Sequence, residues 1–191
     1  MLANSEIVEF GSDALDTAGL DLLALFIGSE GMLGVATEIT VKLLPRPECA
    51  QVVLAAFDDV GTAGQAVANV IAAGIIPAGL EMMDKATTRA VEEFVHAGYD
   101  LDAAAILLCE SDGTPEEVAE EIARMTKVLE DAGASGIQIS KDESERLKFW
   151  SGRKNAFPAA GRLAPDYYSM DGTIPRRHIA TLLKRIAGME E

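Results

Sequence analysis

Apolar and polar residues alternate along most of this chain with the periods of strands and of helices, in turn. Segments that are apolar throughout or at every second position predict strands, and an apolar residue at every third or fourth position predicts a helix. We expect strands over residues 51–57, 77–82, 104–110 and 136–140. Helices are expected over residues 58–74, 84–98, 114–133, 142–157 and 176–187. Two successive strand–helix–strand units with one additional helix predict an α+β fold, a ferredoxin-like antiparallel sheet with helices on one face.

Capping residues mark the starts of several predicted helices. Asp84 and Asp142 stand where an N-cap is expected, and Thr114-Pro115-Glu116-Glu117 has the capping-box pattern with proline at the first helical position. The helix that follows Thr114 would bury an apolar face made of Val118, Ile122, Met125, Val128 and Leu129. These short-range signals place the helix starts independently of the apolar period.

The segment Pro45-Arg46-Pro47 interrupts the chain, because two prolines in three residues can continue neither a helix nor a paired strand. We place a domain boundary there and predict domains over residues 1–47 and 48–191. Further elements are expected from short local patterns: strands over residues 7–10, 39–44 and 167–175, and a helix over residues 21–26.

Composition excludes several classes of partner. The formal charge of −15, from 31 acidic and 16 basic residues, would repel a phosphate backbone, so we expect no nucleic-acid partner. Cys49 and Cys109 are far apart, lack C-x-x-C spacing and are expected as small core residues in a reducing compartment. The longest apolar run covers residues 103–109, too short for a transmembrane segment, and the first residues lack the charged n-region and apolar h-region of a signal peptide. We therefore expect a cytoplasmic protein.

Gly28, Gly31 and Gly34 stand at three-residue spacing shortly before the predicted strand over residues 39–44. Glycines so placed allow positive φ and bring backbone N–H groups close to a ligand, which suits a phosphate or a flat cofactor ring. The spacing is not G-x-G-x-x-G, and β-branched residues follow it, so a Rossmann dinucleotide site is disfavoured. An ordinary glycine-rich turn that enters a strand explains the spacing equally well.

Trp150 and Arg153 lie three residues apart in the predicted helix over residues 142–157, so their side chains share one face. The planar guanidinium of Arg153 matches the two oxygens of a carboxylate and is a candidate clamp for a substrate carboxylate. From the residues alone, an ordinary ion pair with an acidic neighbour on the surface is the favoured alternative, because such pairs are common.

The chain resembles a known family in two separated motifs that occur in the right order. The run from Gly19-Leu20-Asp21-Leu22 through the glycine loop to Lys42-Leu43-Leu44-Pro45 resembles the end of the FAD-binding domain of FAD-linked oxidases of the vanillyl-alcohol oxidase type. Trp150-x-x-Arg153 and Asp171-x-x-x-Pro175 are similar to the C-terminal substrate domain of that family. The resemblance covers essentially the whole chain and is strongest to members that oxidise glycolate, D-lactate and D-2-hydroxyglutarate.

This resemblance implies a flavoenzyme that oxidises a 2-hydroxy acid to the 2-oxo acid by hydride transfer to FAD, with the protein supplying orientation and electrostatics. It implies FAD-binding roles, largely through main-chain groups, for Gly28, Ser29, Glu30, Gly31, Gly34 and Val35. It also implies that Arg153 binds the substrate carboxylate, and it makes companion oxidase subunits candidate partners.

The sequence departs from the family pattern at its ends. Leu20 and Met32 replace a common Tyr and Thr. Within these 191 residues we find no counterpart of the family's first FAD subdomain or of its histidine-rich metal-binding segment. His96 and His178 have no partners at ligand spacing, so we assign neither a metal site nor a catalytic residue. We expect a fragment that binds flavin weakly or not at all, does not turn over, and dimerises through open strand edges.

A non-enzymatic ferredoxin-like module that binds a small ligand or another protein is the alternative function. It shares the double strand–helix–strand plan, and residues 1–47 would then be an arm. The glycine loop followed by Trp150-x-x-Arg153 favours the flavoenzyme, because a simple interaction module has no need of either motif.

Overall fold

The structure is a computed structural model that describes residues 1–12, 14, 19–164 and 166–189. Contacts divide the chain into two compact units, Met1–Pro45 and Arg46–Glu191. The division falls within the Pro45-Arg46-Pro47 segment. The assignment of residues 1–47 to an incomplete FAD-binding domain, and of residues 48–191 to a substrate domain, stays a prediction.

The N-terminal unit contains one short helix, α1 (Leu22–Phe26), close to the predicted range. The Asp21 side chain accepts the backbone N–H of Ala24 at 3.0 Å and so caps the helix. The predicted strands over residues 7–10 and 39–44 are wrong, since the described residues of this unit form no strand. A strand needs a hydrogen-bonded neighbour, and the apolar residues Ile39, Val41 and Leu43 remain exposed.

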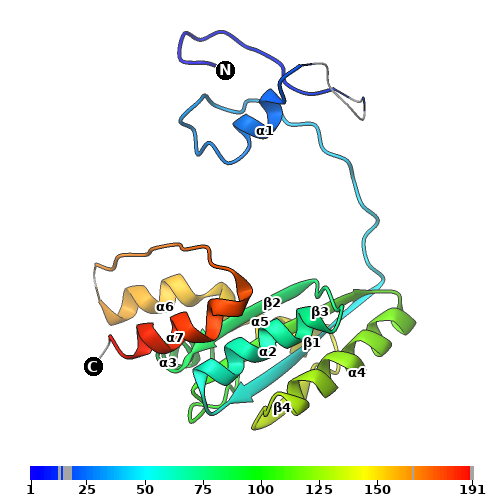
Figure 1. Cartoon of the computed structure of the whole chain (residues 1–191), viewed down its shortest axis with the longest axis vertical. Coiled ribbons are helices and arrows are strands. Elements are labelled where there is room, and N and C mark those ends of the chain that lie inside the picture. Colours follow the sequence, from blue (N-terminus) through cyan, green and yellow to red (C-terminus); the bar gives the residue numbers. More distant parts are fainter. Residues whose placement is uncertain (13, 15–18, 165, 190–191) are drawn as a thin grey trace. The chain divides into compact units, whose positions relative to one another are not determined.

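The second unit is built on a four-stranded sheet (Figure 1). Its strands are β1 (Cys49–Phe57), β2 (Gly79–Asp84), β3 (Ala105–Gly113) and β4 (Gly136–Ile139). They lie in the order β2-β3-β1-β4, and every neighbouring pair is antiparallel. The strand order and the intervening helices confirm the predicted α+β fold with a ferredoxin-like antiparallel sheet.

Helices α2 (Val60–Ala72) and α4 (Pro115–Asp131) lie along one face of this sheet (Figure 1). Asp59 caps α2, and Thr114 with Glu117 forms the predicted capping box at the start of α4. The core on this face contains alternate residues of β1 and β3 and the apolar sides of both helices: Val53, Ala55, Phe57, Ala63, Ala66, Val70, Leu107, Cys109, Val118, Ile122, Met125 and Leu129.

Three further helices cover the opposite face, which differs from the prediction of helices on one face only. They are α3 (Lys85–Val95), α5 (Glu143–Lys154) and α6 (Ala156–Leu163). The intervening residues of the central strands point to this side and form a second core with the helices: Val52, Leu54, Ala56, Met83, Val91, Ile106, Leu108, Phe149 and Ala159. Because β1 and β3 are apolar on both faces, both faces require a covering layer.

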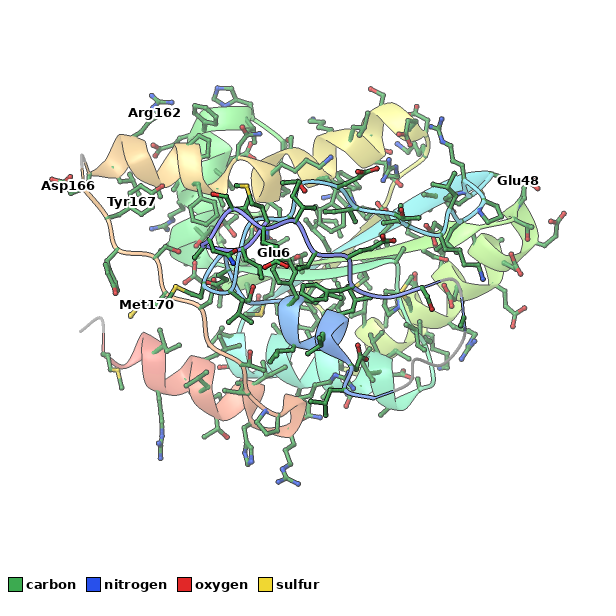
Figure 2. All side chains as sticks on the ribbon, turned by 90° about the horizontal axis from the view of Figure 1, so that it is seen from above. Glu6, Glu48, Arg162, Asp166, Tyr167 and Met170 are labelled. Carbon is green, nitrogen blue, oxygen red and sulfur yellow. The ribbon has the colours of Figure 1, made fainter. Side chains whose placement is uncertain are left out.

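The single helix predicted over residues 142–157 is two helices, α5 and α6, which meet at Asn155. The Asn155 amide group donates to the Ser151 carbonyl at 2.7 Å, and this bond ends α5. Arg162 projects from α6 (Figure 2). Its guanidinium lies 5.6 Å from the ring centre of Phe94 on α3, and this contact joins the two helices.

The C-terminal part of the chain packs back on α2. Residues 167–175 form no strand, so that prediction is wrong, and the 3₁₀ helix η1 (Arg176–His178) and α7 (Ile179–Ala187) follow them. Gly64 permits a close helix contact, because a Cβ there would lie 3.0 Å from Ile179 Cγ2. In the described part of the chain, no helix has the length and apolar character needed to cross a bilayer.

Candidate functional site

The glycine loop follows α1 directly and is shaped by left-handed backbone conformations. Gly28 has φ +79°, Gly31 has φ +80° and Glu30 between them has φ +49°. A Cβ on Gly28 or Gly31 would meet no atom within 4 Å, so these glycines are required by the backbone angle and not by lack of space. The loop therefore presents bare backbone toward open space.

Three N–H groups of the loop are used within the chain. Ser29 donates to Phe26 at 3.1 Å, Met32 donates to Ser29 at 2.9 Å and Val35 donates to the Met1 carbonyl at 2.9 Å. Five other loop N–H groups have no acceptor within the part of the chain that the structure describes: those of Gly28, Glu30, Gly31, Leu33 and Gly34. These are the donors that a ligand lying against the loop could use.

Gly34 has a different role from the first two glycines. A Cβ on Gly34 would lie 2.8 Å from the Met1 carbonyl oxygen, so glycine is needed for the close approach of the two backbone segments. Met1 and Val35 exchange two hydrogen bonds beside it, at 2.7 and 2.9 Å. Gly34 therefore stabilises the shape of the loop, whereas Gly28 and Gly31 lie at its open side.

Helix α5 carries the second group of candidate residues. Asp142 caps the helix by accepting the Glu145 N–H at 2.9 Å. Near its other end, Arg153 donates from Nε to Glu81 Oε2 of β2 at 3.0 Å, and the two side chains are 39% and 42% exposed. The surface ion pair that the residues alone favour for Arg153 therefore exists. It engages only Nε, and Nη1 and Nη2 have no acceptor among the described residues.

Trp150 lies one helical turn before Arg153 and packs against the same strand. A Cβ on Gly79 would lie 2.9 Å from the indole ring, so only glycine leaves room for Trp150 there. The indole N–H donates to the carboxylate of Glu110 on β3, the residue paired with Gly79 in the antiparallel register. The sheet therefore fixes Trp150 by two contacts, the packing of the indole ring on Gly79 and the hydrogen bond from the indole N–H to Glu110.

Glu110 also accepts a hydrogen bond from Arg146 Nη1 at 2.6 Å, and Arg146 in turn pairs with Glu143 at 2.7 Å. The hydrogen bonds to Glu143 and Glu110 raise the pKa of Arg146 above its ordinary value, and the bond from Arg146 lowers the pKa of Glu143. A permanently charged arginine therefore fixes the first half of α5 to β3.

Tyr99 holds the second half of α5. Its hydroxyl donates to the Phe149 carbonyl and accepts the Gly152 N–H at 3.0 Å. Burial is the main reason that the pKa of Tyr99 is raised to about 12. Tyr99, Glu81 and Glu110 were not identified from the sequence. Gly152, a glycine inside a predicted helix, and Gly79, a glycine inside a predicted strand, are the signals in the sequence of such close approaches.

The predicted site residues fall in both units. The glycine loop belongs to Met1–Pro45 and Arg153 to Arg46–Glu191. That the loop binds FAD and that Arg153 binds the substrate carboxylate both stay predictions. Two open surface hollows lie beside η1 and α7, between Ile174 and Arg185, and contain neither the loop nor Arg153. No group of three potential metal ligands occurs among the described residues.

The second unit matches a family model. Residues 46–190 match the model described as "FAD linked oxidases, C-terminal domain", and the chain belongs to this family. The predicted resemblance is therefore confirmed. The chain is 58% identical to glycolate oxidase subunit GlcD of Escherichia coli strain K12 over 188 aligned residues. The alignment covers 98% of this chain and 38% of that protein.

Other relatives agree with this membership. Glycolate oxidase subunit GlcD of Bacillus subtilis is 38% identical, over 97% of this chain and 40% of that protein. The mitochondrial D-lactate dehydrogenase [cytochrome] of Arabidopsis thaliana is 30% identical, over 97% of this chain and 33% of that protein. A solved structure of an alkyldihydroxyacetonephosphate synthase has the same fold, with a TM-score of 0.67 and 18% identity over 91% of this chain and 37% of that one. The chain spans about two fifths of the length of the GlcD relatives.

Proposed function

We propose that this chain is part of a flavin-dependent 2-hydroxy-acid oxidoreductase of the glycolate- or D-lactate-oxidising type, which forms the 2-oxo acid. The observation that carries the proposal is the 58% identity, over 98% of the chain, to a glycolate oxidase subunit. Membership of the FAD-linked oxidases favours this function over a non-enzymatic module with the same ferredoxin-like sheet.

Arg153 is the proposed binding residue for the substrate carboxylate. Its terminal nitrogens, Nη1 and Nη2, are the part of the guanidinium without a protein acceptor among the described residues. Two parallel N–H groups match the two oxygens of a carboxylate, and a charge-assisted pair of this kind is stronger than one between neutral groups. Arg153 would thereby orient the carbon that carries the hydroxyl.

The glycine loop is the proposed contact with FAD, through Gly28, Ser29, Glu30, Gly31, Gly34 and Val35. The backbone donors of Gly28, Glu30, Gly31 and Gly34 support this role, because they have no acceptor among the described residues, whereas the N–H groups of Ser29 and Val35 are used within the chain. The Glu30 carboxylate would repel a pyrophosphate, so this donor set suits the polar edge of the flavin ring better than the phosphates. When bound, FAD supplies the redox chemistry by accepting the α-hydrogen of the hydroxy acid as a hydride.

These residues bind and orient, and none of them is assigned as a catalytic base. We therefore propose that the 191 residues alone bind flavin weakly and do not turn over, because a partial binding surface offsets less of the cost of ordering the cofactor. Flavin absorbance that stays with the purified chain through gel filtration would contradict this part of the proposal.

Partners and location are further parts of the proposal. GlcD is named as a subunit of glycolate oxidase, so companion oxidase subunits are proposed for the protein that contains this chain. The edge strands β2 and β4 are candidates for self-association, because unpaired strand edges favour pairing with a second chain. A cytoplasmic location is proposed from the reducing-compartment pattern of two free cysteines.

The substitution Arg153→Ala tests the central assignment. In the flavoprotein that contains this chain, we expect the KM for glycolate and D-lactate to rise by about 100-fold, in line with the loss of a charge-assisted contact. Arg124→Ala is the matched control, because Arg124 lies on α4, across the sheet, and also makes one hydrogen bond, to the Ala73 carbonyl at 3.0 Å. Equal KM values in both variants would remove Arg153 from the substrate site.

A further inference from the structure

Two side chains of α5, those of Trp150 and Arg153, contact the strand β2 at Gly79 and Glu81. Gly79 and Glu81 lie two residues apart, on one face of the strand and about 7 Å apart along it. Trp150 and Arg153 lie three residues apart on the helix, which is a rise of about 4.5 Å. The Trp150 ring fills the space over Gly79. The Arg153 guanidinium meets the Glu81 carboxylate at 3.0 Å.

We propose that Glu81 is a positioning residue for Arg153, and that it holds the guanidinium by Nε so that the Nη1 and Nη2 edge remains available to a substrate carboxylate. This inference rests on the proposed function, which makes Arg153 the carboxylate-binding residue. Nothing in the family match or in the named relatives assigns a role to Glu81.

The hydrogen-bond geometry supports this arrangement. A guanidinium has five N–H donors, and Glu81 takes the single one on Nε. A bidentate pair between Glu81 and the two terminal nitrogens would compete directly with a substrate carboxylate, whereas a single bond to Nε leaves that edge free. The side chain of Arg153 has several rotatable bonds, so fixing Nε also removes freedom that substrate binding would otherwise have to restrict.

A comparison with Glu110 separates positioning from structural stabilisation. Glu110 is largely buried and accepts hydrogen bonds from both Arg146 and Trp150, so it fixes the helix to the sheet. Glu81 is half-exposed and, among the described residues, pairs with Arg153 alone. A surface pair of this kind contributes little to stability. Its main effect is on where the guanidinium points.

Three substitutions of Glu81 test this role in the flavoprotein that contains the chain. Glu81→Ala removes the acceptor, Glu81→Asp keeps the charge but shortens the side chain, and Glu81→Gln keeps the length and an acceptor oxygen without the charge. We expect Glu81→Ala and Glu81→Asp to raise the KM for the hydroxy acid about tenfold, with a smaller change in kcat, since the bond to Arg153 is lost. Glu81→Gln should retain most of the wild-type affinity.

A spectroscopic measurement reports the same contact without turnover. The Nε–H of Arg153 should give a proton–nitrogen NMR signal that is protected from solvent exchange by the bond to Glu81, and Arg153→Lys assigns it by its disappearance. Glu81→Ala should abolish the protection and Glu81→Gln should keep it. Asp131→Asn is the matched control, because it breaks the exposed Lys127–Asp131 pair on α4 and should change neither KM nor this signal.

The outcomes separate this inference from the proposed function. A raised KM in Arg153→Ala together with an unchanged KM in Glu81→Ala would overturn the positioning role of Glu81 and leave the proposed function intact. Equal KM values in Glu81→Gln and Glu81→Ala would overturn the hydrogen-bond explanation, because charge alone would then matter. An unchanged KM in Arg153→Ala would overturn the proposed substrate role, and the inference with it.

Discussion

The hydroxyl of Tyr99 accepts the backbone N–H of Gly152 at a point where a side chain on Gly152 could not fit. A Cβ there would lie 2.4 Å from the Tyr99 ring and hydroxyl. This contact fixes the part of α5 between Trp150 and Arg153, so the orientation of both signature residues depends on a tyrosine that comes from outside the helix.

Gly152→Ala should therefore destabilise the protein although alanine is the better helix former. We expect a loss of about 1–3 kcal/mol in the free energy of unfolding, because the added methyl group must displace Tyr99 or the helix. Urea denaturation measures it. Gly161→Ala in α6 is the matched control, since its Cβ would make an ordinary contact of 3.9 Å with Tyr167. A control that loses as much stability would show that the effect does not come from Tyr99.

Tyr99 also predicts a pH dependence of stability. Its pKa is raised from the ordinary value of 10.0 to about 12, chiefly by burial, so the neutral phenol is favoured in the folded protein. The unfolded chain ionises first, and the contribution of Tyr99 is complete below about pH 10 and lost as the pH rises toward 12. The difference in Tm between the wild type and Tyr99→Phe should shrink from about pH 9 to about pH 11.5. A constant difference would contradict the shift.

Much of the second unit could be predicted from the sequence because its signals are local. Asp84, Thr114 and Asp142 each stand just before an apolar pattern of helical period, and each caps the helix that this pattern predicts. The four strands of the sheet were found because each is a run of apolar or alternating residues. The strands expected over residues 7–10, 39–44 and 167–175 did not form, because a strand depends on a neighbour that a local pattern does not reveal.

The contacts of the candidate site were less accessible to prediction. Arg153 was identified by spacing and resemblance, but its partner Glu81 lies 72 residues away in the sequence. Glu110 lies 40 residues from Trp150. In an acidic chain with 31 carboxylate side chains, no pattern distinguishes these two from the others. Only the antiparallel register of β2 and β3 brings them beneath α5.

Glu110→Ala should weaken the attachment of α5 to the sheet. It removes the acceptor of both Arg146 and the Trp150 indole, and we expect a loss of about 1.5–3 kcal/mol in the free energy of unfolding, as for hydrogen bonds to charged groups. Trp150 is the only tryptophan, so its fluorescence should shift to longer wavelength as the ring becomes more hydrated. Glu143→Gln changes the exposed partner of Arg146 and should leave the emission where it is. An unshifted spectrum in Glu110→Ala would contradict the indole contact.

Gly31→Ala tests the proposed flavin contact of the N-terminal unit. Gly31 has φ +80° and open space beside its missing side chain, so the substitution introduces backbone strain of about 1–2 kcal/mol without a steric clash inside the chain. It also places a methyl group on the open side of the loop, where the ligand is proposed to lie. Both effects should weaken FAD binding. A loss of about 1.4 kcal/mol in binding free energy would raise the dissociation constant of FAD about tenfold.

The measurement is the dissociation constant of FAD, followed by flavin fluorescence in the protein that contains this chain. Gly172→Ala is the matched control, since Gly172 is also exposed and has no neighbour within 4 Å of a Cβ, but its φ lies outside the left-handed region. Gly34→Ala shows separately how FAD affinity responds when the loop is distorted, because its Cβ would clash with the Met1 carbonyl on the packed side of the loop. If the FAD affinity of Gly31→Ala equals that of Gly172→Ala, the open side of the loop does not contact the flavin.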